Sequence, residues 1–177
     1  IINLDKDDYI NLINICTGLY SPITGFCDYK TYLSIINKKK LDNSIDWTIP
    51  ILLKSTININ SSNKKNFFKL KYNKKIVGLI QANSKFKINK NLFNQSVFGT
   101  NSNSHPGVKI INKKTNSFIG GKIFMLKKYI PKNKYYATPK KLRFYVKRNQ
   151  ISSSSAFTTR NICHTGHFFI HQHILKK

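Results

Sequence analysis

The sequence predicts an α+β fold in which a small β-rich barrel or sandwich is followed by the start of an α/β unit. Many short strand candidates follow one another in the first part, and turn residues separate them. Near Thr138 the pattern changes to helix, strand, loop and helix, with no further strands after it. We therefore expect two structural parts, residues 1–137 and residues 138–177.

The first elements are expected to be short. Residues 5–20 have mixed apolar spacing and predict a short helix, and the turn residues Pro22 and Gly25 come directly after it. A second helix is expected over residues 29–38. Residues 47–53 are typical of a strand that carries Pro50 at its edge or in a bulge.

The rest of the first part is expected to be mostly strands. The expected elements are a loop at 61–65, strands at 67–72 and 75–82, a turn at 105–107, and strands at 108–111 and 118–126. The pair Gly120-Gly121 indicates a close approach of another backbone segment.

The second part should begin with a capped helix. Thr138 is a good N-cap, and Pro139 suits the first helical position of a helix that runs to about Arg148. A strand is expected at residues 151–157, and a last helix is expected to run to the end of the chain.

The composition is strongly basic, with 31 Lys and Arg against 6 Asp and Glu and a net charge of +25. Such a charge normally indicates a polyanionic partner. The excess is almost entirely Lys, accompanied by Ile and Asn, and all three have A/T-rich codons. Mutational drift therefore explains the charge as well as a selected polyanion surface does, and we favour drift.

The composition also limits the cellular compartments in which we expect the protein. No stretch approaches the roughly 20 apolar residues that span a bilayer, and no signal peptide is visible. Three cysteines without ligand spacing favour a reducing, cytoplasmic compartment. The chain opens without Met and ends without a helix stop signal, so we expect both ends to be cut.

Short motifs spread over nearly the whole chain resemble the ATP sulfurylase (sulfate adenylyltransferase) family. They are, in the family's order, Gly18-x-Tyr-Ser-Pro-x-x-Gly-Phe26, Trp47-x-Ile-Pro-Ile51, Val97-Phe-Gly-Thr100, His105-Pro-Gly-Val108, Gly120-Gly121, Thr138-Pro-x-x-Leu-Arg143 and Ala156-Phe-Thr-Thr-Arg-Asn-x-x-His-x-x-His167. Each motif is weak alone, but their common order is specific.

The resemblance implies both a fold and a reaction. It implies a PUA-like β-barrel domain over residues 1–137 and the start of a nucleotidyltransferase α/β catalytic domain over 138–177. In the implied reaction sulfate attacks the α-phosphorus of ATP and gives adenylyl sulfate and pyrophosphate. Magnesium accompanies the ATP, and no tightly bound cofactor is expected. The expected partners are ATP, sulfate and a second copy or a missing C-terminal half; nucleic acid and membrane are not expected.

The last motif would carry the chemistry. Both reactants are anions and sulfate is a poor nucleophile, so positioning and charge neutralisation must do much of the catalysis. The planar fork of Arg160 can hold two sulfate oxygens, with Thr158 beside it. Thr159 and Asn161 can donate to oxygens around the α-phosphorus. His164 and His167, three residues apart near a helix start, would face the other phosphates.

The chain also departs from the family. Thr158 replaces a Gln, Ile162 replaces a Pro, and Thr165 replaces an Arg. Ser154 and Ser155 stand in a strand that is usually apolar, where each unpartnered hydroxyl would cost about 1–3 kcal/mol. Most of the catalytic domain would lie beyond Lys177, so the chain by itself is expected to be inactive.

Several alternatives stay open at this point. A basic PUA-like module could bind RNA without catalysis. Alternatively, the C-terminal residues could bind zinc through Cys163, His164, His167 and His171. His105 is more easily explained as a turn residue, and His173 and the three cysteines as structural or incidental. The sequence leaves open whether the reaction would serve sulfate assimilation or run in reverse.

Overall fold

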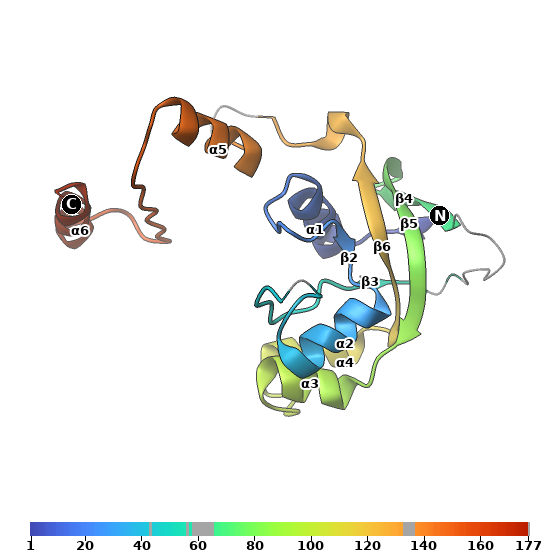
Figure 1. Cartoon of the computed structure of the whole chain (residues 1–177). Helices are drawn as coiled ribbons and strands as arrows, with labels where there is room; N and C mark the ends of the chain where they lie inside the picture. Colours follow the sequence, from blue (N-terminus) through green and yellow to red (C-terminus); the bar gives the residue numbers. More distant parts are fainter. Residues whose placement is uncertain (43, 56, 58–65, 133–136, 177) are drawn as a thin grey trace. The chain divides into compact units, whose positions relative to one another are not determined.

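The computed structural model describes residues 1–42, 44–55, 57, 66–132 and 137–176 (Figure 1). The chain forms two compact units, Ile1–Pro139 and Lys140–Lys177. Among its described residues, the first unit combines a six-stranded mixed sheet with four α-helices, so the predicted α+β class is confirmed. The loop predicted at residues 61–65 lies outside the described residues.

The sheet has the strand order β1-β4-β5-β6-β2, and β3 also pairs with β6. The strands are β1 (Ile2–Asn3), β2 (Gly25–Phe26), β3 (Leu53–Lys54), β4 (Asn66–Tyr72), β5 (Lys75–Lys87) and β6 (Ser117–Met125). β1 and β4 pair in parallel, and the other pairs of these strands are antiparallel. Among the described residues no pairing joins β1 to β2 or β3, so a closed barrel is not observed there.

The strands predicted at 67–72, 75–82 and 118–126 correspond to β4, β5 and β6. A two-residue turn joins β4 to β5, with Asn73 and Lys74 at φ 45° and 62°. Both residues are left-handed, as a type I′ hairpin turn requires, and this turn suits the twist of the strands. β5 is longer than predicted because its second half, after an irregularity between Ala82 and Ser84, continues to pair with β6.

Helix α1 (Lys6–Cys16) confirms the short helix predicted within residues 5–20. Asp8 N donates to the Asp5 carboxylate at 2.8 Å, and Asp5 N donates to the Asp8 carboxylate at 3.3 Å, which forms a capping box. Burial, together with the nearby charge of Asp5, raises the pKa of Asp8 to about 6. The capping that starts the helix therefore places a carboxyl in a site that favours its protonated form.

Helix α2 (Tyr29–Lys38) has the predicted bounds. The carboxylate of Asp28 accepts from Thr31 N at 2.8 Å and caps its start, and Lys39 ends it in a left-handed conformation at φ 57°. Its buried face carries Tyr32, Ile35 and Ile36.

The strand predicted at residues 108–111 is wrong. These residues lie in helix α4 (Pro106–Lys113), which Pro106 begins at the first helical position. Val108 and Ile111 are three residues apart and share a helix face, a spacing that an isolated apolar run does not reveal. Helix α3 (Lys90–Phe98) was not predicted; Asn89 caps it and Gly99 ends it at φ 71°.

The strand predicted at residues 47–53 is largely wrong, since only Leu53 and Lys54 pair as β3. Pro50 has no N–H to donate to a ladder. Trp47 makes hydrogen bonds to nearby residues and not to a strand of the sheet. Its backbone N donates to Lys39 O, and its indole N donates to Ile49 O, both at 2.8 Å.

Two main hydrophobic clusters hold the first unit. One lies between α1 and the sheet and includes Leu12, Leu70, Ile80 and Ile119. The other joins α2, α3 and the far ends of β5 and β6, and its buried members are Tyr32, Ile36, Phe86, Ile88, Phe93 and Phe118. Figure 1 shows α1 beside one half of the sheet and α2, α3 and α4 beside the other half.

Gly120 and Gly121 confirm the predicted close approach. A methyl group on Gly120 would collide with the carbonyl oxygen of Cys27, and one on Gly121 would collide with that of Gln81. Gly121 also has φ 150°. The two glycines therefore let β6 lie against backbone on both sides.

The second unit contains α6 (Thr165–Leu175) and all of α5 (Pro139–Arg148) except its first residue, and both predicted helices are confirmed. The strand predicted at 151–157 is wrong, because these residues form no strand and are exposed. A lone serine-rich segment has neither a partner strand nor an apolar face to bury. No helix in the described part of the chain has the length and apolar character needed to cross a membrane.

Replacing Gly120 by Ala should lower the free energy of unfolding by about 2–3 kcal/mol, because β6 and the Cys27 backbone would have to separate. Gly18→Ala is the matched control: it stands at φ 81° with open space around its Cβ position, and should cost only about 1 kcal/mol. Urea unfolding of the two variants measures the difference. An equal or smaller loss for Gly120→Ala would contradict the assigned contact.

Asp8→Asn should stabilise the protein at pH 7. The folded-state pKa of Asp8 is about 6, above its ordinary value of 3.8, so the native state binds the proton more tightly. Wild-type stability should therefore fall as the pH rises from about 4 to 6, by at most about 3 kcal/mol. The variant should lack that fall and match the wild type below pH 4. Urea unfolding across this pH range tests it; a wild type more stable at pH 7 than the variant would contradict it.

Candidate functional site

The candidate site lies in the second unit, where an irregular segment connects α5 to α6. Thr159 Oγ1 accepts from Asn161 N at 3.0 Å and contacts Asn161 O at 3.4 Å. This side chain thus closes a local turn around Arg160. Thr158, Thr159, Arg160 and Asn161 are all exposed, so their polar groups are open to solvent.

His164 and His167 lie at the start of α6, as the sequence predicted. His164 is the N-cap: its Nδ1 accepts from Gly166 N at 3.2 Å, while its backbone N donates to Nδ1 of His167 at 3.3 Å. The two ring centroids are 4.0 Å apart. Because both Nδ1 atoms accept hydrogen bonds, each neutral ring carries its proton on Nε2. Two N–H donors therefore remain for an anion at this helix end.

Phe157 joins the irregular segment to α6. Its ring meets His167 edge-on at a centroid distance of 5.3 Å and His171 at 4.6 Å. These contacts bring Phe157, His167 and His171 together, and His164 adjoins them.

The structure does not gather the remaining candidates into an enclosed site. Cys163 is exposed. The described residues contain no group of three or more His, Cys, Asp or Glu placed to hold a metal ion, so the zinc alternative gains no geometric support. His105 lies in a turn, as predicted: its backbone N donates to Ser102 O at 3.1 Å just before α4 begins, and the centroid of its ring lies 4.9 Å from that of Phe98.

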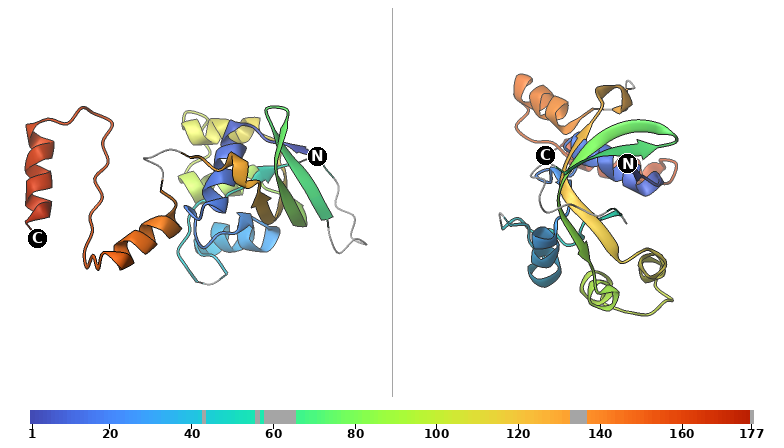
Figure 2. Two further views of the ribbon diagram at one scale, coloured as in Figure 1. Left: turned by 90° about the horizontal axis from the view of Figure 1, so that it is seen from above. Right: turned by 90° about the vertical axis from the view of Figure 1, so that its right-hand side faces the viewer.

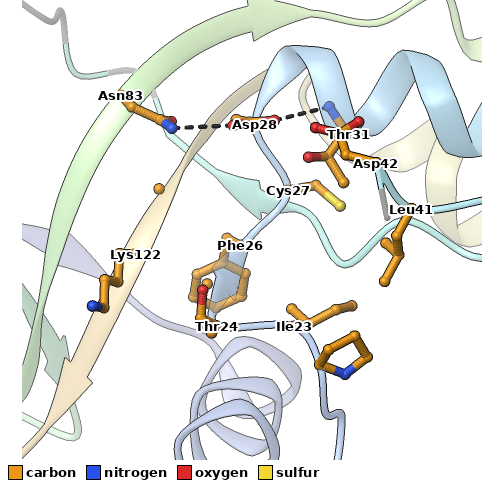
Figure 3. A pocket seen from close by; sticks show the side chains of 13 residues that line it. Ile23, Thr24, Phe26, Cys27, Asp28, Thr31, Leu41, Asp42, Asn83 and Lys122 are labelled. Carbon is orange, nitrogen blue, oxygen red and sulfur yellow. Dashed lines mark hydrogen bonds between the residues drawn. The ribbon is translucent and has the colours of Figure 1, made fainter. Parts of the chain in front are cut away.

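Sequence reasoning missed a cavity of about 370 Å³ in the first unit (Figure 3). Its apolar wall includes Pro22, Ile23, Phe26 and Leu41, and its polar rim includes Thr24, Asp28, Asp42 and Lys122. The motif with Pro22 and Gly25 predicted only a turn. The other lining residues come from distant parts of the chain, so no local pattern marks the cavity.

Two titratable groups of this cavity, Asp28 and Cys27, have shifted pKa values. The Asp28 carboxylate accepts from Thr31 N at 2.8 Å and from Asn83 Nδ2 at 3.1 Å (Figure 3). Burial opposes ionisation of Asp28, but these hydrogen bonds outweigh it and lower its pKa. Burial raises the pKa of the Cys27 thiol to about 12, so the thiol stays protonated at neutral pH. At neutral pH Cys27 therefore offers no thiolate nucleophile, and the Asp28 carboxylate already accepts two hydrogen bonds.

Comparison with known proteins gives the family. A family model described as a PUA-like domain matches residues 1–128. Sulfate adenylyltransferase of Ignicoccus hospitalis is 30% identical over 96% of this chain, and that of Hyperthermus butylicus is 32% identical over 90%. The matched regions make up 45% and 42% of those two proteins, so the chain spans less than half the length of either relative.

A solved structure supports the fold. The hexameric APS kinase from Thiobacillus denitrificans superposes with a TM-score of 0.64 at 17% identity, over 99% of this chain and 32% of that one. At this identity the likeness concerns the fold alone. The match over residues 1–128 shows that the chain belongs to the PUA-like domain family, and its sequence is similar to sulfate adenylyltransferases over nearly its whole length.

Proposed function

We propose that this chain is the N-terminal portion of a sulfate adenylyltransferase and that it does not catalyse the reaction alone. The supporting observation is that the motifs occur in the family's order along a chain similar to sulfate adenylyltransferases over nearly its whole length. In the reaction a sulfate oxygen attacks the α-phosphorus of ATP, a new P–O bond forms, and the bond to pyrophosphate breaks.

The roles of the motif residues follow from their donors. Arg160 would hold two sulfate oxygens with its planar guanidinium, and the Thr158 hydroxyl would add a third contact. Thr159 and Asn161 would donate to oxygens on the α-phosphorus, where negative charge grows during the attack. Thr159 would have to leave its hydrogen bond with Asn161 N, which an exposed turn permits.

The two histidines would bind the leaving pyrophosphate. Their Nε2–H groups and the N–H groups at the start of α6 are donors, and a helix N-terminus favours an anion. Magnesium, when bound with ATP, would neutralise part of the phosphate charge. Residues 140–177 contain no Asp or Glu, so the nucleotide phosphates rather than this segment would hold that ion.

We further propose that residues 1–137 are the PUA-like domain and that residues 138–177 begin the catalytic domain. In the second unit no described residue is buried. Large apolar side chains are exposed on both helices: Leu142, Phe144, Tyr145, Phe168, Phe169 and Leu175. Such side chains ordinarily need cover, which a further part of the protein or a second copy would supply.

The 177-residue chain should release no pyrophosphate from ATP and sulfate above background, because its exposed motif cannot exclude water or enclose both anions. Coupled detection of pyrophosphate measures this. Turnover that disappears in Arg160→Ala would show that the chain alone is active and would contradict the prediction.

The motif itself is tested by restoring the missing part. We would join this chain to the portion of the Ignicoccus hospitalis enzyme that lies beyond the matched region. The fused protein should form adenylyl sulfate, and Arg160→Ala should lower its kcat/KM at least about 100-fold. The control Arg148→Ala, an exposed Arg of α5 outside the motif, should change it less than about twofold. If the fused protein is inactive while the relative cut and rejoined at the same point is active, the proposed function is wrong for this chain.

A further inference from the structure

Residues from several distant stretches of the first unit line the cavity of about 370 Å³. They come from the turn before β2 and β2 itself, the start of α2, the residues that follow α2, and the middle of β5 and β6. Figure 1 and both views of Figure 2 show α2 beside β5, and Tyr29 N donates to Ser84 Oγ at 3.1 Å where these two elements meet. Small-molecule sites usually measure roughly 300–1,000 Å³, so the cavity is large enough for a small organic molecule.

The cavity gathers negative charge in a strongly basic chain. The chain has 6 acidic residues against 31 Lys and Arg, and two of those six, Asp28 and Asp42, line this cavity. Burial opposes ionisation of Asp28, but its hydrogen bonds from Thr31 and Asn83 lower its pKa, so it is charged at neutral pH. Asp42 is exposed and pairs with Lys30 Nζ at 3.2 Å. A ligand therefore meets two carboxylates, one on each side of α2.

Lys122 lines the cavity without neutralising these carboxylates. Its Nζ lies 5.5 Å from the ring centroid of Phe124, which is not a lining residue. In Figure 3 the nitrogen of Lys122 points away from the other labelled side chains. The charge that a ligand meets inside the cavity is therefore that of the carboxylates.

The cation that already contacts one of these carboxylates is held weakly. Lys30 and Asp42 form an ion pair in which the two side chains are 82% and 46% exposed. Exposed ion pairs contribute little to stability, because water screens the charges and two long side chains must be ordered. A ligand ammonium in the cavity can therefore take the place of Lys30 at Asp42.

An anion fits the cavity less well, although the start of α2 forms part of its wall. A helix N-terminus favours a negative group, but Asp28 already fills this position, since its carboxylate accepts from Thr31 N at 2.8 Å. A metal ion would leave the apolar wall unused. Among the residues that the structure describes, there is also no group of three or more His, Cys, Asp or Glu placed to hold one. Charge complementarity therefore selects an organic cation.

We propose that this cavity binds a small primary amine with an apolar body. The ammonium donates to the carboxylates of Asp28 and Asp42; each Asp28 oxygen accepts one hydrogen bond from the protein and keeps a second lone pair. The apolar body lies against Ile23, Phe26 and Leu41. Figure 3 shows Asp28 and Asp42 at one end of the view and Ile23 and Phe26 at the other. This binding is independent of the catalytic motif and goes beyond the proposed adenylyl transfer.

The test uses 2-phenylethylamine as the probe, because its ammonium and its ring match the two parts of the cavity. The probe is titrated into the 177-residue chain labelled at the Ile and Leu methyl groups, and binding is followed by NMR. The methyl signals of Ile23 and Leu41 should shift and saturate at millimolar probe concentrations. Those of Leu79 and Ile110, which are exposed elsewhere on this unit, should not shift.

Two further probes test the role of charge. 2-Phenylethanol has the same ring and a neutral hydroxyl, and 3-phenylpropionate has the same ring and a negative charge. Both should bind at least about tenfold more weakly than the amine, because a hydrogen bond between charged groups is roughly twice as strong as one between neutral groups.

Matched variants test the contact with Asp42. Asp42→Asn should weaken binding of the amine at least about fivefold. Asp46→Asn removes the same charge from an exposed residue that pairs with Lys40 outside the cavity, and should change the affinity less than about twofold. Lys30→Met removes the competing cation and should strengthen binding about twofold or more, whereas Lys109→Met, at an exposed position of α4, should leave it unchanged.

Three outcomes would overturn the proposal. If the Ile23 and Leu41 signals do not saturate, the cavity does not hold the amine. Equal affinity for 2-phenylethanol would show apolar binding in which the carboxylates have no part. Equal effects of Asp42→Asn and Asp46→Asn would show attraction by overall charge and no contact with Asp42. Thermal unfolding of each variant confirms that the comparison is between folded proteins.

Discussion

The contact between β6 and the segment around Cys27 is the constraint on which the first unit depends. β6 pairs with β5 along one edge and with β2 and β3 along the other. Thr24 O accepts from Ile123 N at 3.3 Å, and Cys27 N donates to Ile51 O at 2.9 Å. Segments distant in sequence thus converge on one strand. They can do so because Gly120 and Gly121 present no side chain at the points where other backbones pass.

The same convergence positions the functional surfaces of the first unit. Because β2 lies beside β6 in the sheet, Asp28 begins α2 close to Asn83 of β5, and the cavity forms where these elements meet. Because β5 pairs with both β4 and β6, the residues that alternate with the core positions form one open surface. The side chains of these strands that point inward pack in the hydrophobic cluster, and those that point outward can contact solvent or a ligand.

The sequence predicted those features that depend on residues close together in the chain, such as helix starts. Helices were expected over residues 29–38 and from Pro139 onward, and α2 and α5 formed there. Gly120 was identified because only glycine tolerates such an approach, although its partner Cys27 could not be named. The errors lie where contacts with distant parts of the chain decide the structure. Residues 108–111 have too few apolar positions to distinguish the helical repeat of 3.6 residues from the strand repeat of 2, and Pro50 interrupts a strand whose pairing partner the sequence does not reveal.

In the candidate site, the helix start at His164 followed from the sequence. The hydrogen bonds to the histidine Nδ1 atoms and the contact with Phe157 could not be predicted, because they depend on how the histidine and phenylalanine rings are oriented.

The two units differ in what they need in order to function. The first has its own buried hydrophobic clusters. The second has hydrogen-bond donors but no buried residue among those described: Arg160 and His164 are exposed and His167 is half-buried, so each hydrogen bond to an anion competes with solvation and contributes little. The same groups become effective only where water is excluded and the dielectric constant is low. On the proposed function, this chain would supply the hydrogen-bond donors of the motif, and the enclosing environment would come from protein that covers the exposed faces of α5 and α6.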